Sequence, residues 1–381
     1  MEPPKTRGAS LPELAGVFLK LGTIAFGGPA AHLAMMEEEF VRRRRWISHA
    51  EFLDRLAAAN LIPGPSSTEV AIFIGQAKRG WRGLIVAGCC FILPAAFIVV
   101  AIAWVYVKFG SLPQAQGVLH AIKPVVVAVV IQALGRLGRS GLRTPLLAVI
   151  AALAVVLNVV GVSPLLVLVC AGMLGTAAQK MKNRLLAGIG TPKAIGAALL
   201  AATATAAGFE VSLPRLFLSF LKIGSVVFGS GYVLLAFLRS EFVEHLHWLT
   251  EKQLLDAVAV GQFTPGPVFT TATFIGYVVA GWRGAVVATA GIFLPGFVLV
   301  ALSGPLIPRL RRSPVASAAL DGVVAGSLAL MAVVTWQIGK ASIVDWTTLA
   351  LFAVSLLALL RFHLNSVWLI AAAGIMGWLL R

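Results

Sequence analysis

The sequence Pro63-Gly64-Pro65, followed by Ser66-Ser67-Thr68-Glu69, decides how this chain folds, because its pattern appears twice. The second copy is Pro265-Gly266-Pro267, 202 positions later, preceded by Thr264 and followed by Thr270-Thr271. Proline lacks a backbone N–H and fixes its own φ, and glycine adopts dihedral angles that other residues avoid. Each copy is therefore expected to interrupt a helical segment and to start a new helix directly after the break.

The same offset relates longer stretches on both sides of this motif. Phe18-Leu19-Lys20-Leu21-Gly22 matches Phe220-Leu221-Lys222-Ile223-Gly224, and after a one-residue deletion Gly80-Trp81-Arg82-Gly83 matches Gly281-Trp282-Arg283-Gly284. Self-similarity at a fixed offset is the signature of a duplicated unit. We therefore divide the chain into repeat 1 (residues 1–183), a linker with one membrane segment (184–213) and repeat 2 (214–381).

The composition requires a lipid environment. Of the 381 residues, 59% are apolar and 12% are charged, which is about half the charged fraction of soluble domains. Apolar runs follow one another with short basic clusters between them, a pattern typical of membrane-spanning helices. We predict an all-α polytopic membrane protein with about 13 membrane segments. The net charge of +16 then belongs to loops, and nucleic acid is excluded as a partner because no soluble domain presents a basic face.

The basic residues change place between the two repeats. Repeat 1 carries four arginines at Arg42–Arg45, whereas the matching stretch of repeat 2 reads Glu244-His245-Leu246-His247. Conversely, three arginines lie in 309–312, and the corresponding loop 110–116 is uncharged. Because cytoplasmic loops are enriched in Lys and Arg, this exchange predicts repeats of inverted topology. The single crossing that reverses the second repeat is assigned to 194–209.

The broken, re-entrant helices are the candidate substrate site. Non-helical backbone at membrane depth is tolerated where protein encloses it or a water-filled cavity borders it. The N-terminus of a half-helix presents N–H groups and a positive dipole end, which suit an anion. The candidate residues are Lys20, Gly27, Gly28, Pro63, Gly64, Pro65, Ser66, Ser67 and Thr68 of repeat 1, and Lys222, Gly229, Ser230, Gly231, Thr264, Pro265, Gly266, Pro267, Thr270 and Thr271 of repeat 2.

Two structural alternatives stay open for these residues. Pro-Gly-Pro can kink a purely structural helix, and a lysine in an apolar run can extend its ammonium to the lipid headgroups. The occurrence of both features in both repeats favours the functional interpretation, since a cation in an apolar run is costly.

Three acids are candidates for proton coupling. Glu69 lies one turn inside the helix that follows Pro65 and has no counterpart in repeat 2. Its carboxylate either complements the helix dipole or competes with a bound anion for the same N–H groups. Glu39 and Glu241 are the next candidates. These two acids, like the repeated Asp54 and Asp256, are otherwise expected to be loop residues or salt-bridge partners of Arg82 and Arg283.

No other motif points to chemistry. The sequence contains no ATP-binding motif, no metal-ligand spacing and no nucleophile beside a base, so we expect no enzyme, no cofactor and no metal site. The single histidines are expected to make ordinary polar contacts; they are His32, His49, His120 and His363.

Taken together, the Phe-X-Lys-X-Gly and Phe-Gly-Gly-Pro opening, the Pro-Gly-Pro motif, and Gly-Trp-Arg-Gly before a Phe-X-X-Pro span resemble the chromate ion transporter family over essentially the whole chain. The resemblance implies a multi-pass protein of the bacterial inner membrane, with about thirteen spans and halves of opposite topology, that exports chromate by using the proton-motive force. Expected partners are a chromate- or sulfate-like dianion, protons and the lipid bilayer, with a homodimer left open.

Other functions are weaker alternatives. Chromate and sulfate are both tetrahedral dianions of similar size, so a sulfate or other oxyanion permease is the nearest alternative. A membrane-embedded scaffold or a lipid-acting enzyme would need a soluble appendage or a catalytic constellation, and the sequence offers neither.

The exchange of basic residues predicts opposite orientations for the two halves. In a variant without the three native cysteines, a cysteine introduced beside Arg44 should be protected from a membrane-impermeant thiol reagent added outside the cell. A cysteine beside His245 should react with it. Labelling of both positions from the same side would rule out the inverted arrangement.

Overall fold

The computed structural model describes residues 9–26, 28–110, 112–186, 211–228, 233–303, 313–362, 364 and 366–379. Within these ranges every regular element is a helix, so the all-α prediction is confirmed. The linker crossing predicted at 194–209, the arginines of 309–312, His363, Gly27 and Gly229 to Gly231 lie outside the described residues.

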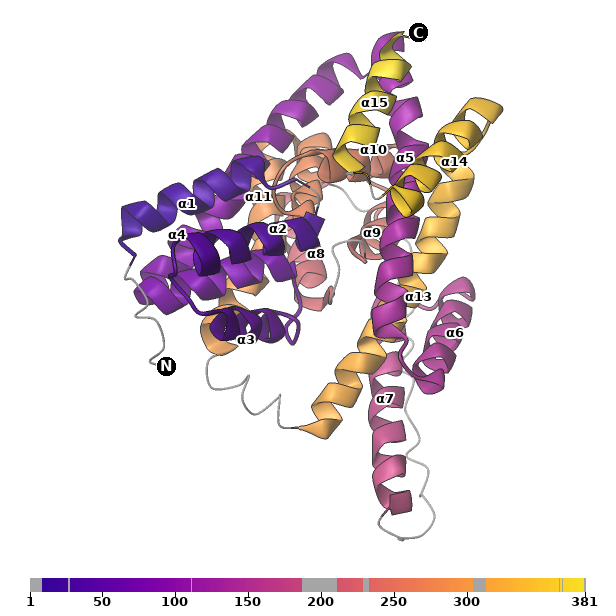
Figure 1. The fold of residues 1–381 in the computed structure, drawn as a ribbon. Coiled ribbons are helices and arrows are strands. Elements are labelled where there is room, and N and C mark those ends of the chain that lie inside the picture. The colour runs from indigo at the N-terminus through magenta and orange to yellow at the C-terminus, as the bar shows by residue number, and fades with distance from the viewer. Residues whose placement is uncertain are drawn as a thin grey trace.

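The helices follow the same order in both repeats (Figure 1). Repeat 1 comprises α1 (Leu11–Ile24), α2 (Gly28–Glu37), the π-helix η1 (Glu38–Arg43), α3 (His49–Ala59), α4 (Ser66–Phe109), α5 (Pro113–Gly141), α6 (Pro145–Val159) and α7 (Pro164–Leu186). Repeat 2 comprises α8 (Leu213–Val226), α9 (Leu234–Leu238), the π-helix η2 (Arg239–His245), α10 (Glu251–Phe263), the short 3-10 helix η3 (Val268–Thr270), α11 (Thr271–Ser303), α13 (Pro314–Ser342), α14 (Trp346–Arg361) and α15 (Ser366–Leu379).

The duplicated sequence produces duplicated local structure. Ser48 and Glu51 form a capping box at the start of α3, in which each side chain accepts the other's backbone N–H. Thr250 and Gln253, 202 positions later, form the same box at the start of α10. A capping box satisfies two of the N–H groups that a helix start leaves free. Both repeats therefore begin this helix at the same point for the same reason.

The long helices α4 and α11 are helical hairpins. In α4 the backbone reverses at Arg79 and Gly80, where the glycine adopts φ +57°; in α11 it reverses at Ala280 and Gly281, where φ is +63°. The arms of the α4 hairpin touch so closely that a Cβ on Gly75 would collide with the carbonyl of Gly83. The arm that precedes the bend, 66–78, is about 20 Å long, less than the roughly 30 Å of a bilayer core.

The two repeats interlock rather than lie apart. One helix group consists of α1, α4, α8 and α11, and the other consists of α5, α6, α7, α13, α14 and α15, so each combines matching helices of both repeats (Figure 1). In the first group a Cβ on Gly22 would lie 2.5 Å from the Phe91 carbonyl, and Gly224 meets Ile292 in the same way. Glycine allows helix backbones to approach this closely.

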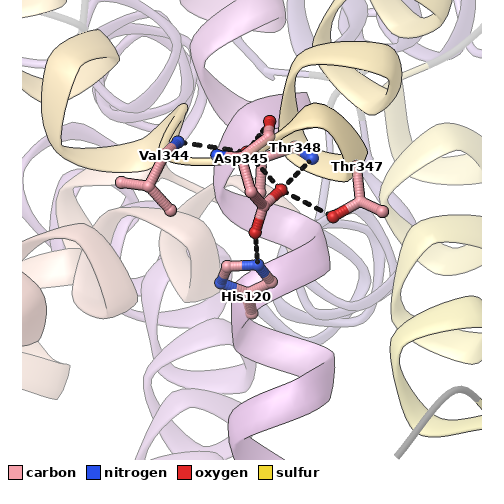
Figure 2. A network of polar contacts seen from close by, with 5 residues as sticks. All are labelled: His120, Val344, Asp345, Thr347 and Thr348. Carbon is pink, nitrogen blue, oxygen red and sulfur yellow. Dashed lines mark hydrogen bonds and ion pairs between the residues drawn. The ribbon is translucent and has the colours of Figure 1, made fainter.

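Polar contacts also join α5 to the start of α14 (Figure 2). Asp345 accepts hydrogen bonds from the Thr347 hydroxyl and the Thr348 backbone N–H, and its other oxygen lies 3.1 Å from His120 Nε2 on α5. The bonds from Thr347 and Thr348 hold the pKa of Asp345 well below its ordinary value. His120, expected to make an ordinary polar contact, does so here.

Five helices among the described residues are long and apolar enough to cross a membrane: Ser66–Phe109, Pro113–Gly141, Pro164–Met181, Val268–Ser303 and Pro314–Ser342. Shorter apolar helices are α6, α14 and α15. The count of about 13 segments and the inverted topology stay predictions.

The hairpin contact predicts a specific loss of stability. Gly75→Ala should lower the free energy of unfolding by about 1–3 kcal/mol, because the added methyl group must displace the Gly83 backbone. Gly16→Ala in α1 is the matched control, since a Cβ there meets no atom within 4 Å. Thermal unfolding of the detergent-solubilised protein measures both. Equal melting temperatures for the two variants would contradict the tight hairpin.

Candidate functional site

Each Pro-Gly-Pro loop bonds to the interrupted helix of the other repeat. The Gly64 N–H donates to the Val227 carbonyl just after α8, at 2.8 Å. The Gly266 N–H donates to the Ala25 carbonyl just after α1, also at 2.8 Å. Residues 25 and 227 correspond in the repeat, as do 64 and 266, so the two bonds are equivalent. Such reciprocal pairing is produced by a two-fold relation, and it brings four interrupted segments to one place.

The loops need glycine at their centres. Gly64 has φ +138° and Gly266 has φ +88°, where other residues are strained. A Cβ on Gly266 would also lie 2.6 Å from the Cβ of Ala95. Pro65 and Pro267 are extended and directly precede helices, and neither provides a side-chain cap. The sequence therefore correctly predicted a helix break and a fresh helix start in both repeats.

The buried hydroxyls of repeat 2 are satisfied by their own backbone. Thr264 donates to the Val260 carbonyl, Thr270 to Pro267 and Thr271 to Val268, at 2.8 to 3.0 Å. In repeat 1, Ser66, Ser67 and Thr68 are also buried. Among the described residues, however, the Thr68 hydroxyl has no hydrogen-bond partner. The two half-sites therefore differ in the polar groups that they leave available.

His32 belongs to the site, although the sequence indicated only an ordinary polar contact. Its Nε2 lies 3.0 Å from the Ala25 carbonyl, the same oxygen that accepts from Gly266. A carbonyl only accepts, so Nε2 carries a hydrogen. Nδ1 lies 3.2 Å from the Ser67 hydroxyl, and the ring is buried against Phe91. The sequence offered one signal for this residue: the position of repeat 2 that corresponds to His32 is Leu234, so repeat 1 has a polar side chain where repeat 2 has an apolar one.

Glu69 is fully buried, and neither of its carboxyl oxygens has a hydrogen-bond partner among the described residues. Its Oε1 lies so close to Gly64 that any Cβ there would collide with it. Its Cγ lies 3.9 Å from the place a Cβ would take on Gly296 of α11. The carboxyl thus lies between the loop of repeat 1 and a helix of repeat 2. A buried polar group without a partner is costly and marks a functional site by default.

Lys222 and the other two acids are paired elsewhere, and Lys20 is exposed. Lys222 is half-exposed, and its Nζ lies 2.8 Å from Glu241, which also accepts from Ser219. Lys20, at the equivalent position, is exposed on α1. The predicted substrate role of both lysines and the proton role of Glu241 stay predictions, with the ammonium of Lys222 held by a carboxylate.

Glu39 lies in η1, in a cluster of arginines. Arg44 Nε donates to it at 2.7 Å and Arg43 at 3.1 Å. Burial raises the pKa of Glu39, but the Arg44 hydrogen bond and the charges of Arg43, Arg44 and Lys20 together lower the pKa below its ordinary value. The proton role of Glu39 stays a prediction, and Glu69, which has no ion-pair partner among the described residues, stays the first of the three candidates.

The prediction that Asp256 pairs with Arg283 is wrong. Its carboxylate accepts from the Tyr106 hydroxyl at 2.9 Å and lies 2.9 Å from Lys123 Nζ. Arg283 instead lies over the exposed ring of Trp282, 5.6 Å from its centroid. The physical reason is the bend at Gly281, which places Arg283 at the outer turn of the α11 hairpin.

Comparison with known proteins decides the family. A model of the chromate transporter family matches residues 12–176 and again residues 214–378. The chain belongs to the chromate transporter family. It is 34% identical to the chromate transport protein of Cupriavidus metallidurans, over 99% of this chain and 97% of that one. It is 32% identical to the chromate transport protein of Pseudomonas aeruginosa, over 97% and 92% of the two chains. No solved structure matches it.

The family membership confirms the resemblance seen in the sequence. With its apolar helices, the chain is a multi-pass membrane protein of a transporter family, and its relatives are named transport proteins rather than enzymes. The family model also matches each half separately, in agreement with the duplication.

The bonds between each Pro-Gly-Pro loop and the opposite repeat predict a loss of transport when either loop is removed. Replacing Pro63-Gly64-Pro65 or Pro265-Gly266-Pro267 by three alanines should extend the preceding helix and remove the bond to the opposite repeat. Chromate uptake into membrane vesicles should fall at least about tenfold, while the protein still inserts. Gly135→Ala is the control, because a Cβ there meets no atom within 4 Å. Unchanged uptake in both loop variants would exclude the loops from the site.

Proposed function

We propose that this chain is a secondary active transporter that exports chromate, a tetrahedral oxyanion, across the inner membrane by using the proton-motive force. The observation that carries the proposal is the buried carboxyl of Glu69, which has no hydrogen-bond partner among the described residues and lies between Gly64 and Gly296. The helix start after Pro65 and the buried Ser66, Ser67 and Thr68 directly precede it, and the second Pro-Gly-Pro loop bonds to Ala25, whose carbonyl also contacts His32. N–H groups, hydroxyls and positive helix ends are the ligands that a dehydrated dianion requires.

The reciprocal loop contacts support an alternating-access mechanism. A two-fold relation between the repeats follows from the paired bonds of Gly64 and Gly266. The exchange of basic loops supports an axis within the membrane plane, as in transporters with inverted repeats. In such proteins one group of helices rocks against another around a fixed site. The two interlocked helix groups are the natural moving bodies.

Coupling to protons follows from electrostatic competition at Glu69. An ionised Glu69 and a bound dianion repel each other, so the site holds one or the other. Protonation of Glu69 from the outer side removes its charge and lets the dianion bind from the inner side. Glu69 then releases the proton inward as the dianion leaves outward. A negative-inside potential drives the dianion outward by about 2.3 kcal/mol per charge at 100 mV. The potential and the proton gradient therefore both favour export in exchange for protons.

Transport in everted membrane vesicles tests this proposal. Labelled chromate should accumulate in vesicles that contain the protein, which corresponds to export from the cell, and an acidic lumen should stimulate the uptake. Excess sulfate should compete only weakly. Strong uptake of sulfate that chromate fails to inhibit would instead support a sulfate permease.

Glu69→Gln tests the coupling step. The neutral amide mimics the protonated carboxyl, so the variant should still exchange chromate for chromate but lose its stimulation by an acidic lumen. Glu38→Gln is the control, since Glu38 is an exposed acid 3.7 Å from Arg42. If Glu69→Gln keeps full stimulation, the coupling acid is a different residue.

A further inference from the structure

A second buried carboxylate lies at a cavity away from the Pro-Gly-Pro loops and their contacts with the opposite repeat. The cavity has a volume of about 280 Å³, and its lining includes Tyr106, Gly110, Leu119, Lys252, Gln253 and Asp256. Asp256 has no solvent-exposed surface of its own, yet it borders this space. A cavity of this volume can hold water molecules when polar groups line it.

Asp256 takes part in a polar triad that both repeats supply. Asp256 comes from α10 of repeat 2, whereas Tyr106 comes from α4 and Lys123 from α5 of repeat 1. The ammonium of Lys123 is nearly buried, with 12% of its side chain exposed. A buried ion pair contributes little net stability, because desolvation offsets the attraction. Its presence inside a membrane protein therefore points to function.

The repeat indicates that the triad is not a structural necessity. The residue of repeat 2 that corresponds to Lys123 is Val324, on α13. The fold therefore forms this helix packing once with the ammonium and once without it.

Other charged groups lie on the elements packed against α10. On α5, His120 lies 3.1 Å from Asp345, and on α4 the ammonium of Lys108 lies over the ring of Trp104. Lys252 lies one turn earlier on α10 and lines the cavity. Of the elements packed against α10, α15 has no titratable residue between Ser366 and Leu379, and α11 has Tyr277 and Arg283. The charges of η2 are largely paired: Arg239 with Glu244 and Glu251, and Glu241 with Lys222. On α13, Asp321 and Lys340 lie toward opposite ends of the helix.

The cavity faces the outer side in the proposed topology. The α4 hairpin bends beside the basic residues Lys78, Arg79 and Arg82, which are assigned to the cytoplasm. The arm from 81 to 109 is about 40 Å long, enough to cross the bilayer. Tyr106, near the end of this arm, therefore lies close to the opposite surface.

We propose that Asp256 is the site at which the transporter takes up a proton from the outer side, with Lys123 and Tyr106 as the residues that bind its carboxylate until then. This inference rests on the proposed proton-driven export. The proton passes from cavity water to a carboxylate oxygen of Asp256, forming an O–H bond, and Lys123 remains an ammonium. The ion pair that joins α10 to α5 is thereby lost.

Protonation of Asp256 then acts on the substrate site through α10. The loop that contains Gly266 begins at Thr264, two turns along the same helix and about 12 Å from Asp256. Loss of the pair loosens the contact between α10 and α5 of the opposite repeat. Because the Gly266 loop is bonded to Ala25 of that repeat, a shift of α10 also moves the contact between this loop and Ala25.

Everted vesicles test the inference, because their lumen is the outer side. Chromate uptake is measured at a series of lumenal pH values with the external pH fixed, and the lumenal pH of half-maximal uptake is recorded. Lys123→Gln should move this midpoint to higher pH by about one unit or more, since the ammonium no longer stabilises the carboxylate. Tyr106→Phe should move it in the same direction by less. Asp256→Asn should abolish the dependence on lumenal pH and retain chromate–chromate exchange.

The outcomes separate this inference from the proposed function. Asp54→Asn, at the corresponding position of repeat 1, is the matched control and should leave the midpoint unchanged. A merely structural pair would reduce uptake at every pH without moving the midpoint, and that result in Lys123→Gln and Tyr106→Phe would overturn the inference. So would a normal lumenal pH dependence in Asp256→Asn. Uptake by the unmodified protein that ignores lumenal pH would overturn the proposed proton drive as well.

Discussion

Backbone hydrogen bonding inside an apolar environment is the constraint on which this structure depends. An interrupted helix leaves N–H and carbonyl groups that lipid cannot satisfy. Here the N–H of each Pro-Gly-Pro loop bonds to a carbonyl at the interrupted helix of the other repeat, Gly64 to Val227 and Gly266 to Ala25. Each repeat therefore helps to satisfy the broken backbone of the other. The duplication thus stabilises the broken helices, and the interlocked helix groups agree with it.

The two repeats share a backbone but differ in their polar side chains. His32 and Glu69 of repeat 1 correspond to apolar or hydroxyl positions in repeat 2, where Leu234 is buried and the threonines bond to their own backbone. The two halves thus share a frame but contribute different polar groups to the candidate site. His32 also supports the frame, because the Ala25 carbonyl accepts from both His32 and Gly266 of the opposite repeat.

Much of the local structure could be predicted from the sequence. The repeat, the helix breaks and the glycine turns depend on neighbouring residues, and all recur in the structure. The repeated aromatic residues also pack alike: Phe18 on Phe40 and Phe40 on Trp46, as Phe220 on Phe242 and Phe242 on Trp248. Partners distant in sequence could not be predicted. Nothing in a single sequence tells that Gly64 bonds to residue 227, or that Asp256 lies beside Lys123 rather than Arg283.

The lysines show where such reasoning stops. A lysine two turns before a helix break fits an anion site by spacing, but the direction of its side chain depends on which charges surround it. For Lys222 the decisive neighbour is Glu241, which η2 brings back beside α8. The ammonium of Lys222 is stabilised more by this carboxylate than it would be beside the Pro-Gly-Pro loops, where the helix starts already supply positive ends. Among the described residues no cation pairs with Glu69. In the proposed mechanism its proton would therefore be controlled by the anion and by water access, and not by a fixed ion pair.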